Sequence, residues 1–178
     1  MSDSPALPRP LTPGRYRIAL VCLGNICRSP MADVVLAERV AARGLDDAVS
    51  VVSAGTGSWH VGEPMDRRAA RLLTARGYDA SRHRAQQATA SWLVDDDAPI
   101  DLVLAMDDAN LRDLQDLNPT APPERLRLFG DFDPEVPGAV VPDPWSGGPE
   151  QFEHVLAMIE RTCDAIAERL ERLPRLAG

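Results

Sequence analysis

The stretch Val21-Cys22-Leu23-Gly24-Asn25-Ile26-Cys27-Arg28-Ser29-Pro30 decides the fold of this chain, because it joins an apolar strand to a helix. Residues 16–21 before it form the apolar segment that we read as the strand. Pro30 is favoured at the start of a helix, and apolar residues at helical spacing follow it as far as Gly44, a residue type that commonly ends helices. We therefore expect a strand, a tight turn and a helix.

The turn between this strand and this helix has the chemistry of an anion site. Its backbone N–H groups, from Leu23 to Arg28, would converge at a helix N-terminus, where unpaired donors and the helix dipole attract negative charge. Cys22 would ionise easily there, since helix N-termini and nearby cations favour the thiolate. Arg28 adds a planar guanidinium that can hold two phosphoryl oxygens.

The spacing of cysteine and arginine is not specific by itself. Cys163 and Arg169 have the same separation, but they lie in a helical run without glycine, where no anion-binding turn can form. The first instance differs because Gly24 and Asn25 accept unusual backbone angles and a strand precedes it. The alternative for Cys22 is a buried structural cysteine in an ordinary turn.

Residues 22–30 resemble the phosphate-binding signature of the low-molecular-weight protein tyrosine phosphatases, a family related to arsenate reductases and protein arginine phosphatases. Further segments resemble the family in the same order: Ser53-Ala54-Gly55-Thr56, residues 105–111 and Asp143-Pro144-Trp145. The resemblance spans about residues 17–173. It implies hydrolysis of phosphotyrosine through a phosphocysteine intermediate, with Cys22 as nucleophile, Arg28 as phosphate clamp and Asp143 as general acid and base.

The same resemblance assigns roles to the other site residues. Those implied to bind the phosphate lie in the loop itself: Leu23, Gly24, Asn25, Ile26, Cys27 and Ser29. Ser29 would also donate a hydrogen bond to the Cys22 sulfur. The pocket walls would be Trp59, His60 and Trp145. Ser53 and His83 would hold Asn25 in a strained conformation without touching substrate.

Two Asp-Pro pairs compete for the general-acid role. Asp133-Pro134 follows the predicted fourth strand closely, whereas Asp143-Pro144 comes later, beside Trp145 and before the last helix. The resemblance favours Asp143, and either residue could instead be a solvated turn aspartate. A reversible disulfide between Cys22 and Cys27, which flank the same turn, is a further hypothesis, with Cys27 as a simple buried residue as its alternative.

Length and patterning predict one α/β domain over residues 15–174. The 178 residues, 44% of them hydrophobic, are enough for a single core. Strands and helices alternate, which favours a four-stranded parallel sheet flanked by helices on both faces, with the phosphate loop after the first strand. The expected strands are 16–21, 49–52, 101–105 and 125–129. Residues 1–14 are rich in proline and are expected to form a disordered tail.

Charge and composition exclude several classes of function. The net charge of −8 and pI near 4.8 argue against nucleic-acid binding, and no apolar run approaches a membrane span. The chain has no lysine, which excludes a Walker-type phosphate loop and Schiff-base chemistry. No cofactor or metal is expected, since the carboxylates of residues 95–97 lack the pattern of a calcium loop. Three cysteines favour a reducing cytoplasm.

The expected partners are phosphotyrosine-containing proteins, with a tyrosine kinase among the candidate substrates. Three alternatives remain. In arginine phosphatases with this signature a threonine takes the place of Ile26, whose apolar side chain suits an aromatic ring better than a guanidinium group. An arsenate reductase needs further cysteines, and only Cys163 lies outside the loop. A non-catalytic phosphotyrosine-binding module would not need both Cys22 and Asp143.

Overall fold

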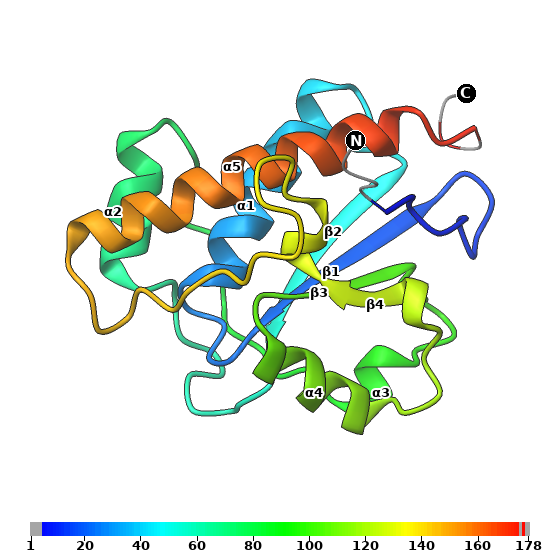
Figure 1. Ribbon diagram of the computed structural model, residues 1–178, viewed down its shortest axis with the longest axis horizontal. Helices are drawn as coiled ribbons and strands as arrows, with labels where there is room; N and C mark the ends of the chain where they lie inside the picture. Colours follow the sequence, from blue (N-terminus) through cyan, green and yellow to red (C-terminus); the bar gives the residue numbers. More distant parts are fainter. Residues whose placement is uncertain (1–4, 175, 177–178) are drawn as a thin grey trace.

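A parallel sheet with the strand order β2-β1-β3-β4 is the centre of the structure, a computed structural model that describes residues 5–174 and 176 (Figure 1). All three strand pairings are parallel, so the expected α/β class and four-stranded sheet are confirmed. Strand β1 pairs along its whole length with β2 and over four residues with β3. The strands are β1 (Tyr16–Cys22), β2 (Val49–Gly55), β3 (Leu102–Ala105) and β4 (Leu126–Leu128).

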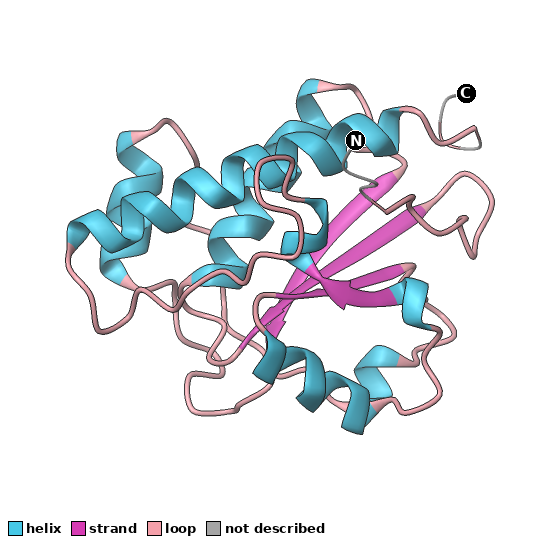
Figure 2. Ribbon diagram, viewed as in Figure 1, coloured by secondary structure: helices cyan, strands magenta, loops and turns pink. Residues whose placement is uncertain are grey.

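Helices cover both faces of the sheet because the strand side chains alternate between two apolar clusters. In β1, Ile18 and Leu20 belong to the larger cluster, whereas Ala19 and Val21 belong to the smaller one. Figure 2 shows the two helical layers on opposite sides of the strands. The larger cluster packs under α1 (Arg28–Ala42), α2 (Arg67–Ala75) and α5 (Pro149–Glu171), and the smaller under α3 (Ala90–Leu93) and α4 (Asp108–Leu117).

The long helix α5 buries a single stripe against α1 and the sheet. Its buried residues recur every three or four positions, from Phe152 to Leu170, and they include Cys163, which has no exposed surface. Cys163 is therefore a core residue, and its burial raises the pKa of the thiol well above the usual value. Within residues 5–174 and 176, no helix is both long and apolar enough to cross a membrane.

The topology brings the loops that follow the strands to one edge of the sheet. The chain passes from β1 to β2 on one side and later enters β3 on the other side of β1. Open α/β sheets bind ligands at such a switch point, outside the carboxyl ends of the strands. The turn after β1, residues 56–66 after β2, Asp107 after β3 and the irregular segment 133–148 after β4 lie at or lead to this edge.

Some element boundaries differ from the sequence predictions. The second strand continues to Gly55, because residues 53–55 still pair with β1. The fourth strand is shorter than expected, since the 3-10 turns Pro123–Arg125 and Phe129–Phe132 flank it. The first helix begins at Arg28, so Pro30 is its third residue rather than its first. Proline is tolerated there because an N–H in the first turn would have no partner within the helix.

The disordered tail expected for residues 1–14 is wrong for residues 5–14, and residues 1–4 lie outside the described part. Leu7 is buried in the larger cluster. The Tyr16 hydroxyl donates to the Pro8 carbonyl at 3.1 Å, and the buried carboxylate of Asp101 accepts from the Leu11 amide at 2.6 Å. Proline content alone misled the prediction, because side chains of the domain satisfy the backbone of this segment.

Candidate active site

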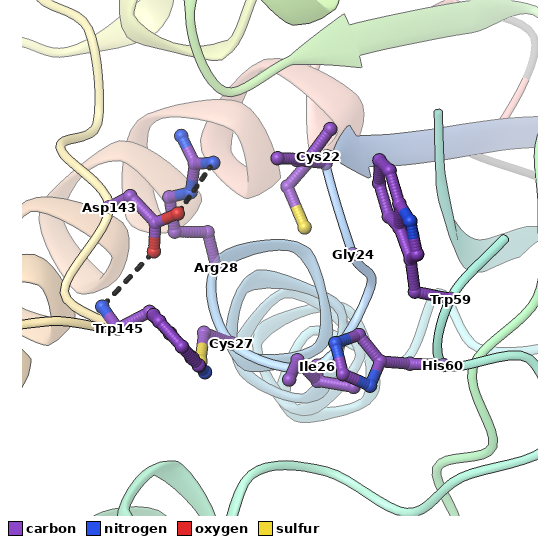
Figure 3. Close-up of a pocket in the computed structure, with 10 residues that line it drawn as sticks. Cys22, Gly24, Ile26, Cys27, Arg28, Trp59, His60, Asp143 and Trp145 are labelled. Carbon is purple, nitrogen blue, oxygen red and sulfur yellow. Dashed lines mark hydrogen bonds and ion pairs between the residues drawn. The ribbon is translucent and has the colours of Figure 1, made fainter. Parts of the chain in front are cut away.

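A cavity of about 290 Å³ opens at the carboxyl end of β1 (Figure 3). The phosphate loop forms one side of it, and the walls come from the loop after β2 and from the segment before α5. Figure 3 shows Trp59 and Trp145 on opposite sides of the cavity, with the Cys22 sulfur between them. Its lining consists of Cys22, Leu23, Gly24, Ile26, Cys27, Arg28, Trp59, His60, Asp143 and Trp145.

The N-terminus of α1 opens onto this cavity without a cap. Its N-cap residue, Cys27, makes no side-chain capping hydrogen bond, and the first turn contains no acidic residue. Most helices satisfy these amide donors with a Ser, Thr, Asp or Asn side chain. Here the donors and the positive end of the helix dipole are left for an anion in the cavity.

Cys22 ends β1 at the bottom of the cavity, with only 3% of its surface exposed. Its sulfur lies 3.0 Å from the Ser29 hydroxyl and accepts the Asn25 amide at 3.3 Å. The Ser29 oxygen accepts a hydrogen bond from the Asn25 side-chain amide at 2.9 Å, so its own proton can be donated to the sulfur or to the Ala54 carbonyl, which lies farther away at 3.3 Å. Both donors stabilise negative charge on the sulfur.

Asn25 holds the loop in shape from behind. Its φ of 56° lies in the left-handed region, where asparagine is tolerated better than most residues. The side chain is fully buried and donates to Ser29 and, at 3.1 Å, to Ser53. Its carbonyl oxygen accepts the Gln86 amide at 3.0 Å. Three polar groups therefore hold the side chain of this one strained residue.

His83 contacts the backbone of the same residue. Its Nε2 lies 2.7 Å from the Asn25 carbonyl oxygen, and an acceptor there requires Nε2 to carry a proton. Burial lowers the pKa of His83, which keeps the imidazole neutral at pH 7. The structure thus brings Ser53 and His83 to Asn25 and places neither in the lining of the cavity.

Arg28 is buried at the cavity and is held by a residue that sequence reasoning gave no role. Its Nη1 donates to Asp107 at 2.6 Å and to the Val141 carbonyl at 3.1 Å. The other oxygen of Asp107 caps α4 by accepting the Asn110 amide at 2.8 Å. Asp107 therefore orients the guanidinium, while Nε and Nη2 form no hydrogen bond with the described residues.

The two competing aspartates lie in different environments. Asp143 lines the cavity, and its carboxylate lies 3.6 Å from Nη2 of Arg28. Asp133 is buried away from the cavity, where Arg161 donates to both of its oxygens at 2.9 and 2.8 Å. Burial acts to raise the pKa of Asp133, but the hydrogen bonds from Arg161 and from two backbone amides outweigh it and lower this pKa. Asp133 is thus a structural ion pair.

The wall opposite Asp143 is built on a close approach of β2 to the phosphate loop. A Cβ at Gly55 would lie 2.6 Å from the Leu23 carbonyl oxygen, so only glycine fits there. The amides of Thr56 and Gly57 donate to the carbonyls of Cys22 and Leu23 at 2.9 Å each. These bonds fix the start of the loop that contains Trp59 and His60 against the phosphate loop.

Three residues of the predicted phosphate-binding set, Asn25, Ser29 and Cys27, need separate comment. Asn25 and Ser29, expected among the phosphate-binding residues, have buried side chains behind the loop and do not line the cavity. Cys22 and Cys27 are both free thiols, and burial raises the pKa of Cys27 far above its usual range, which keeps it a neutral thiol. Across residues 5–174 and 176, no three His, Cys, Asp or Glu side chains are arranged to hold a metal ion.

Sequence reasoning gave Asp107 and Gln86 no role. The signal for Asp107 was its place at the end of the third strand, one residue before a helix, which puts it at the same edge as Cys22. For Gln86 no sequence signal existed, because its backbone amide forms the bond to Asn25.

Comparison with known proteins agrees with this geometry. The sequence model of the family described as "Low molecular weight phosphotyrosine protein phosphatase" matches residues 17–175. The chain belongs to this family. It is 45% identical over 148 residues to the low molecular weight protein-tyrosine-phosphatase of Streptomyces coelicolor, a match that covers 82% of this chain and 87% of that protein. The resemblance stated from residues 22–30 is confirmed.

Two further relatives extend the comparison. Low molecular weight protein-tyrosine phosphatase A of Mycobacterium tuberculosis is 43% identical over 161 residues, covering 87% of this chain and 94% of that protein. The solved structure of Vibrio vulnificus Wzb in complex with benzylphosphonate superposes with a TM-score of 0.74 at 28% identity, covering 88% of this chain and all of that one. The family's fold therefore extends over most of the chain.

The network around Asn25 generates the first prediction. Asn25→Ala loses the side-chain hydrogen bonds and keeps the strained φ, whereas Asn25→Gly loses the same bonds but removes the strain, which costs about 1–2 kcal/mol. We expect Asn25→Gly to unfold at a higher urea concentration than Asn25→Ala. Both should lose about tenfold or more in kcat/KM on an aryl phosphate, since small displacements of reacting groups are costly. Wild-type activity in Asn25→Gly would contradict the supporting role of this side chain.

Proposed function

We propose that this protein hydrolyses phosphotyrosine in proteins through a phosphocysteine intermediate. The proposal rests on one observation: the Cys22 sulfur, Arg28 and the uncapped N-terminus of α1 lie at one end of a cavity that Asp143 also lines. A phosphoryl group placed there would meet a nucleophile, a cation and backbone donors together. Without the nucleophile the cavity would be only a binding site. Without the cation and the backbone donors it would be a pocket that has no means of holding a phosphoryl group for the reaction.

The first step transfers the phosphoryl group to the enzyme. The Cys22 thiolate attacks phosphorus, and the bond between phosphorus and the tyrosine oxygen breaks. Nε and Nη2 of Arg28 and the amides of the loop would hold the equatorial oxygens as their charge redistributes. Asp143 gives its proton to the departing phenolate, so tyrosine leaves as the neutral phenol.

The second step restores the enzyme. Asp143, now a carboxylate, takes a proton from a water molecule that attacks the phosphorus of phosphocysteine. The bond between phosphorus and sulfur breaks, and inorganic phosphate and the thiolate result. The Ser29 hydroxyl, 3.0 Å from the sulfur, would stabilise this leaving thiolate by donating a hydrogen bond.

The shape of the cavity supports an aromatic substrate. Trp59 and Trp145 are 70% and 58% exposed and lie on opposite sides of the opening, so a flat ring could enter between them. Such a slot lets the long phosphotyrosine side chain bring its phosphate to Cys22, which a phosphoserine would not do. The solved structure of Vibrio vulnificus Wzb is a complex with benzylphosphonate, which also joins a phenyl ring to a phosphorus group.

The proposal extends to the substrates, the role and the localisation of the protein. The substrates would be phosphotyrosine-containing proteins, a tyrosine kinase among them, and the role would be in signalling. Cytoplasmic localisation is supported by three cysteines that are all free, because a reducing compartment keeps a nucleophilic thiol active.

Two substitutions test the assigned chemistry. Cys22→Ser should abolish turnover and still bind phosphate, since Arg28 and the loop amides remain. Asp143→Ala should lower kcat/KM by a factor on the order of 10² to 10⁴ for phenyl phosphate, the usual contribution of a positioned acid. The loss should shrink for leaving groups that depart without a proton. A larger effect from Asp133→Ala, measured per folded molecule, would refute the choice of acid.

A further prediction concerns the type of phosphorylated residue that the enzyme prefers. Ile26 lines the cavity, and an apolar side chain there cannot pair with the donors of a phosphoguanidinium group. Leaving such a group unpaired costs about 1–3 kcal/mol. We expect kcat/KM for a phosphotyrosine peptide to exceed that for a phosphoarginine peptide by about tenfold or more, with Ile26→Thr narrowing the difference. Equal cleavage of both, or efficient arsenate reduction in the same panel, would change the substrate class and leave the Cys22 chemistry intact.

A further inference from the structure

We propose that Arg68 is a positioning residue that holds the turn carrying Asp143, residues 142–148, over the phosphate loop. The inference rests on the proposed function, because it assumes that Asp143 is the general acid. Arg68 is the second residue of α2 and is not in the lining of the cavity. It would therefore act through Asp143 and not on the substrate.

The Arg68 side chain is fixed on several sides. Its Nε and Nη2 donate to the two oxygens of Asp66 at 3.2 and 3.0 Å. The face of the guanidinium stacks on the buried ring of Phe152, with 4.7 Å between Cζ and the ring centroid. A fork bond and a stacking contact together leave this flexible side chain few alternative positions.

Asp66 connects this arrangement to the phosphate loop. Its backbone amide donates to the Ile26 carbonyl at 2.9 Å. Its carboxylate caps α2 by accepting the Arg68 amide at 2.8 Å. The guanidinium of Arg68 therefore keeps a nearly constant place relative to the loop that binds the phosphate.

The third nitrogen of Arg68 reaches the acid turn. Nη1 lies 3.5 Å from the Gly147 carbonyl oxygen, a long contact of the kind that often tightens when substrate closes a site. Within the turn, the Trp145 amide donates to Asp143 at 3.1 Å and the Gly147 amide donates to Pro144 at 2.9 Å. Because the turn is bonded to itself, a displacement of Gly147 would displace Asp143.

Few other polar contacts hold this turn. For residues 142–148, the hydrogen bonds and ion pairs to described elements other than α5 are the Arg68 contact and the pair of Arg28 with Asp143, 3.6 Å apart. A bound phosphate would compete for the same Nη2 of Arg28. The contact between Arg68 and Gly147 would then still hold the turn, because a bound phosphate does not compete for it.

The experiment compares two aryl phosphates across a set of variants. Arg68→Gln should lower kcat/KM about tenfold for phenyl phosphate, whose leaving group needs a proton, since small misplacements of catalytic groups cost up to about 10²-fold. With a dinitrophenyl leaving group the loss should be about twofold or less, because the acid contributes little there. The inhibition constant of inorganic phosphate should stay unchanged. Arg68→Lys, which keeps the charge and part of the stacking, should fall between Arg68→Gln and wild type.

The matched control is Arg76→Gln. Arg76 lies at the end of the same helix and also reaches α5, 4.0 Å from Glu153, but makes no contact with the turn. It should behave as wild type on both substrates. A double-mutant cycle adds the deciding readout: in an Asp143→Ala background, Arg68→Gln should cost little more, because residues that act as a unit are not additive.

Equal losses on both substrates, or losses that add to those of Asp143→Ala, would overturn the role of Arg68. Wild-type rates in Arg68→Gln would do the same. If Asp143→Ala itself shows no dependence on the leaving group, the proposed acid is wrong instead. The two failures are therefore distinguishable in one data set.

Discussion

The structure depends on a helix N-terminus that is kept open. The first amides of α1 have no side-chain cap, because the N-cap residue Cys27 makes no capping hydrogen bond. Asn25 keeps them in place by adopting a left-handed conformation that Ser29, Ser53 and Gln86 hold from behind. The buried hydrogen-bond network thus stabilises a loop conformation in which the backbone donors remain available to an anion.

A second constraint is electrostatic. The chain carries a net charge of −8, so its overall field repels an anionic substrate and the site must supply attraction locally. Arg28 does this from a buried position, with Asp107 balancing its charge and orienting it. Asp143, which we propose as the general acid, lies 3.6 Å from Nη2 of the same guanidinium. One arginine thus links the phosphate site, the end of β3 and the acid turn.

Sequence alone predicted the parts of the site that are local. The strand, turn and helix around Cys22 follow from residue order, and the alternating pattern predicted the parallel sheet. Distant partners such as Ser53 and His83 came only from the family resemblance. Neither the residue pattern nor the resemblance singled out Arg68, because its contacts with Phe152 and Gly147 join segments about 80 residues apart. The segment 5–14 was misjudged for the same reason, since Asp101 and Tyr16 hold it from distant positions.

The central claim is that the phosphoryl group passes through the sulfur of Cys22, and trapping that intermediate tests it most directly. A phosphotyrosine peptide labelled with ³²P would be mixed with the enzyme, and the reaction quenched within milliseconds under conditions that preserve thiophosphate bonds. Peptide mapping should place the label on the fragment containing Cys22, and the label should disappear when unlabelled substrate is added in a chase. Label on another residue, or product release with no labelled enzyme at any time, would contradict the account.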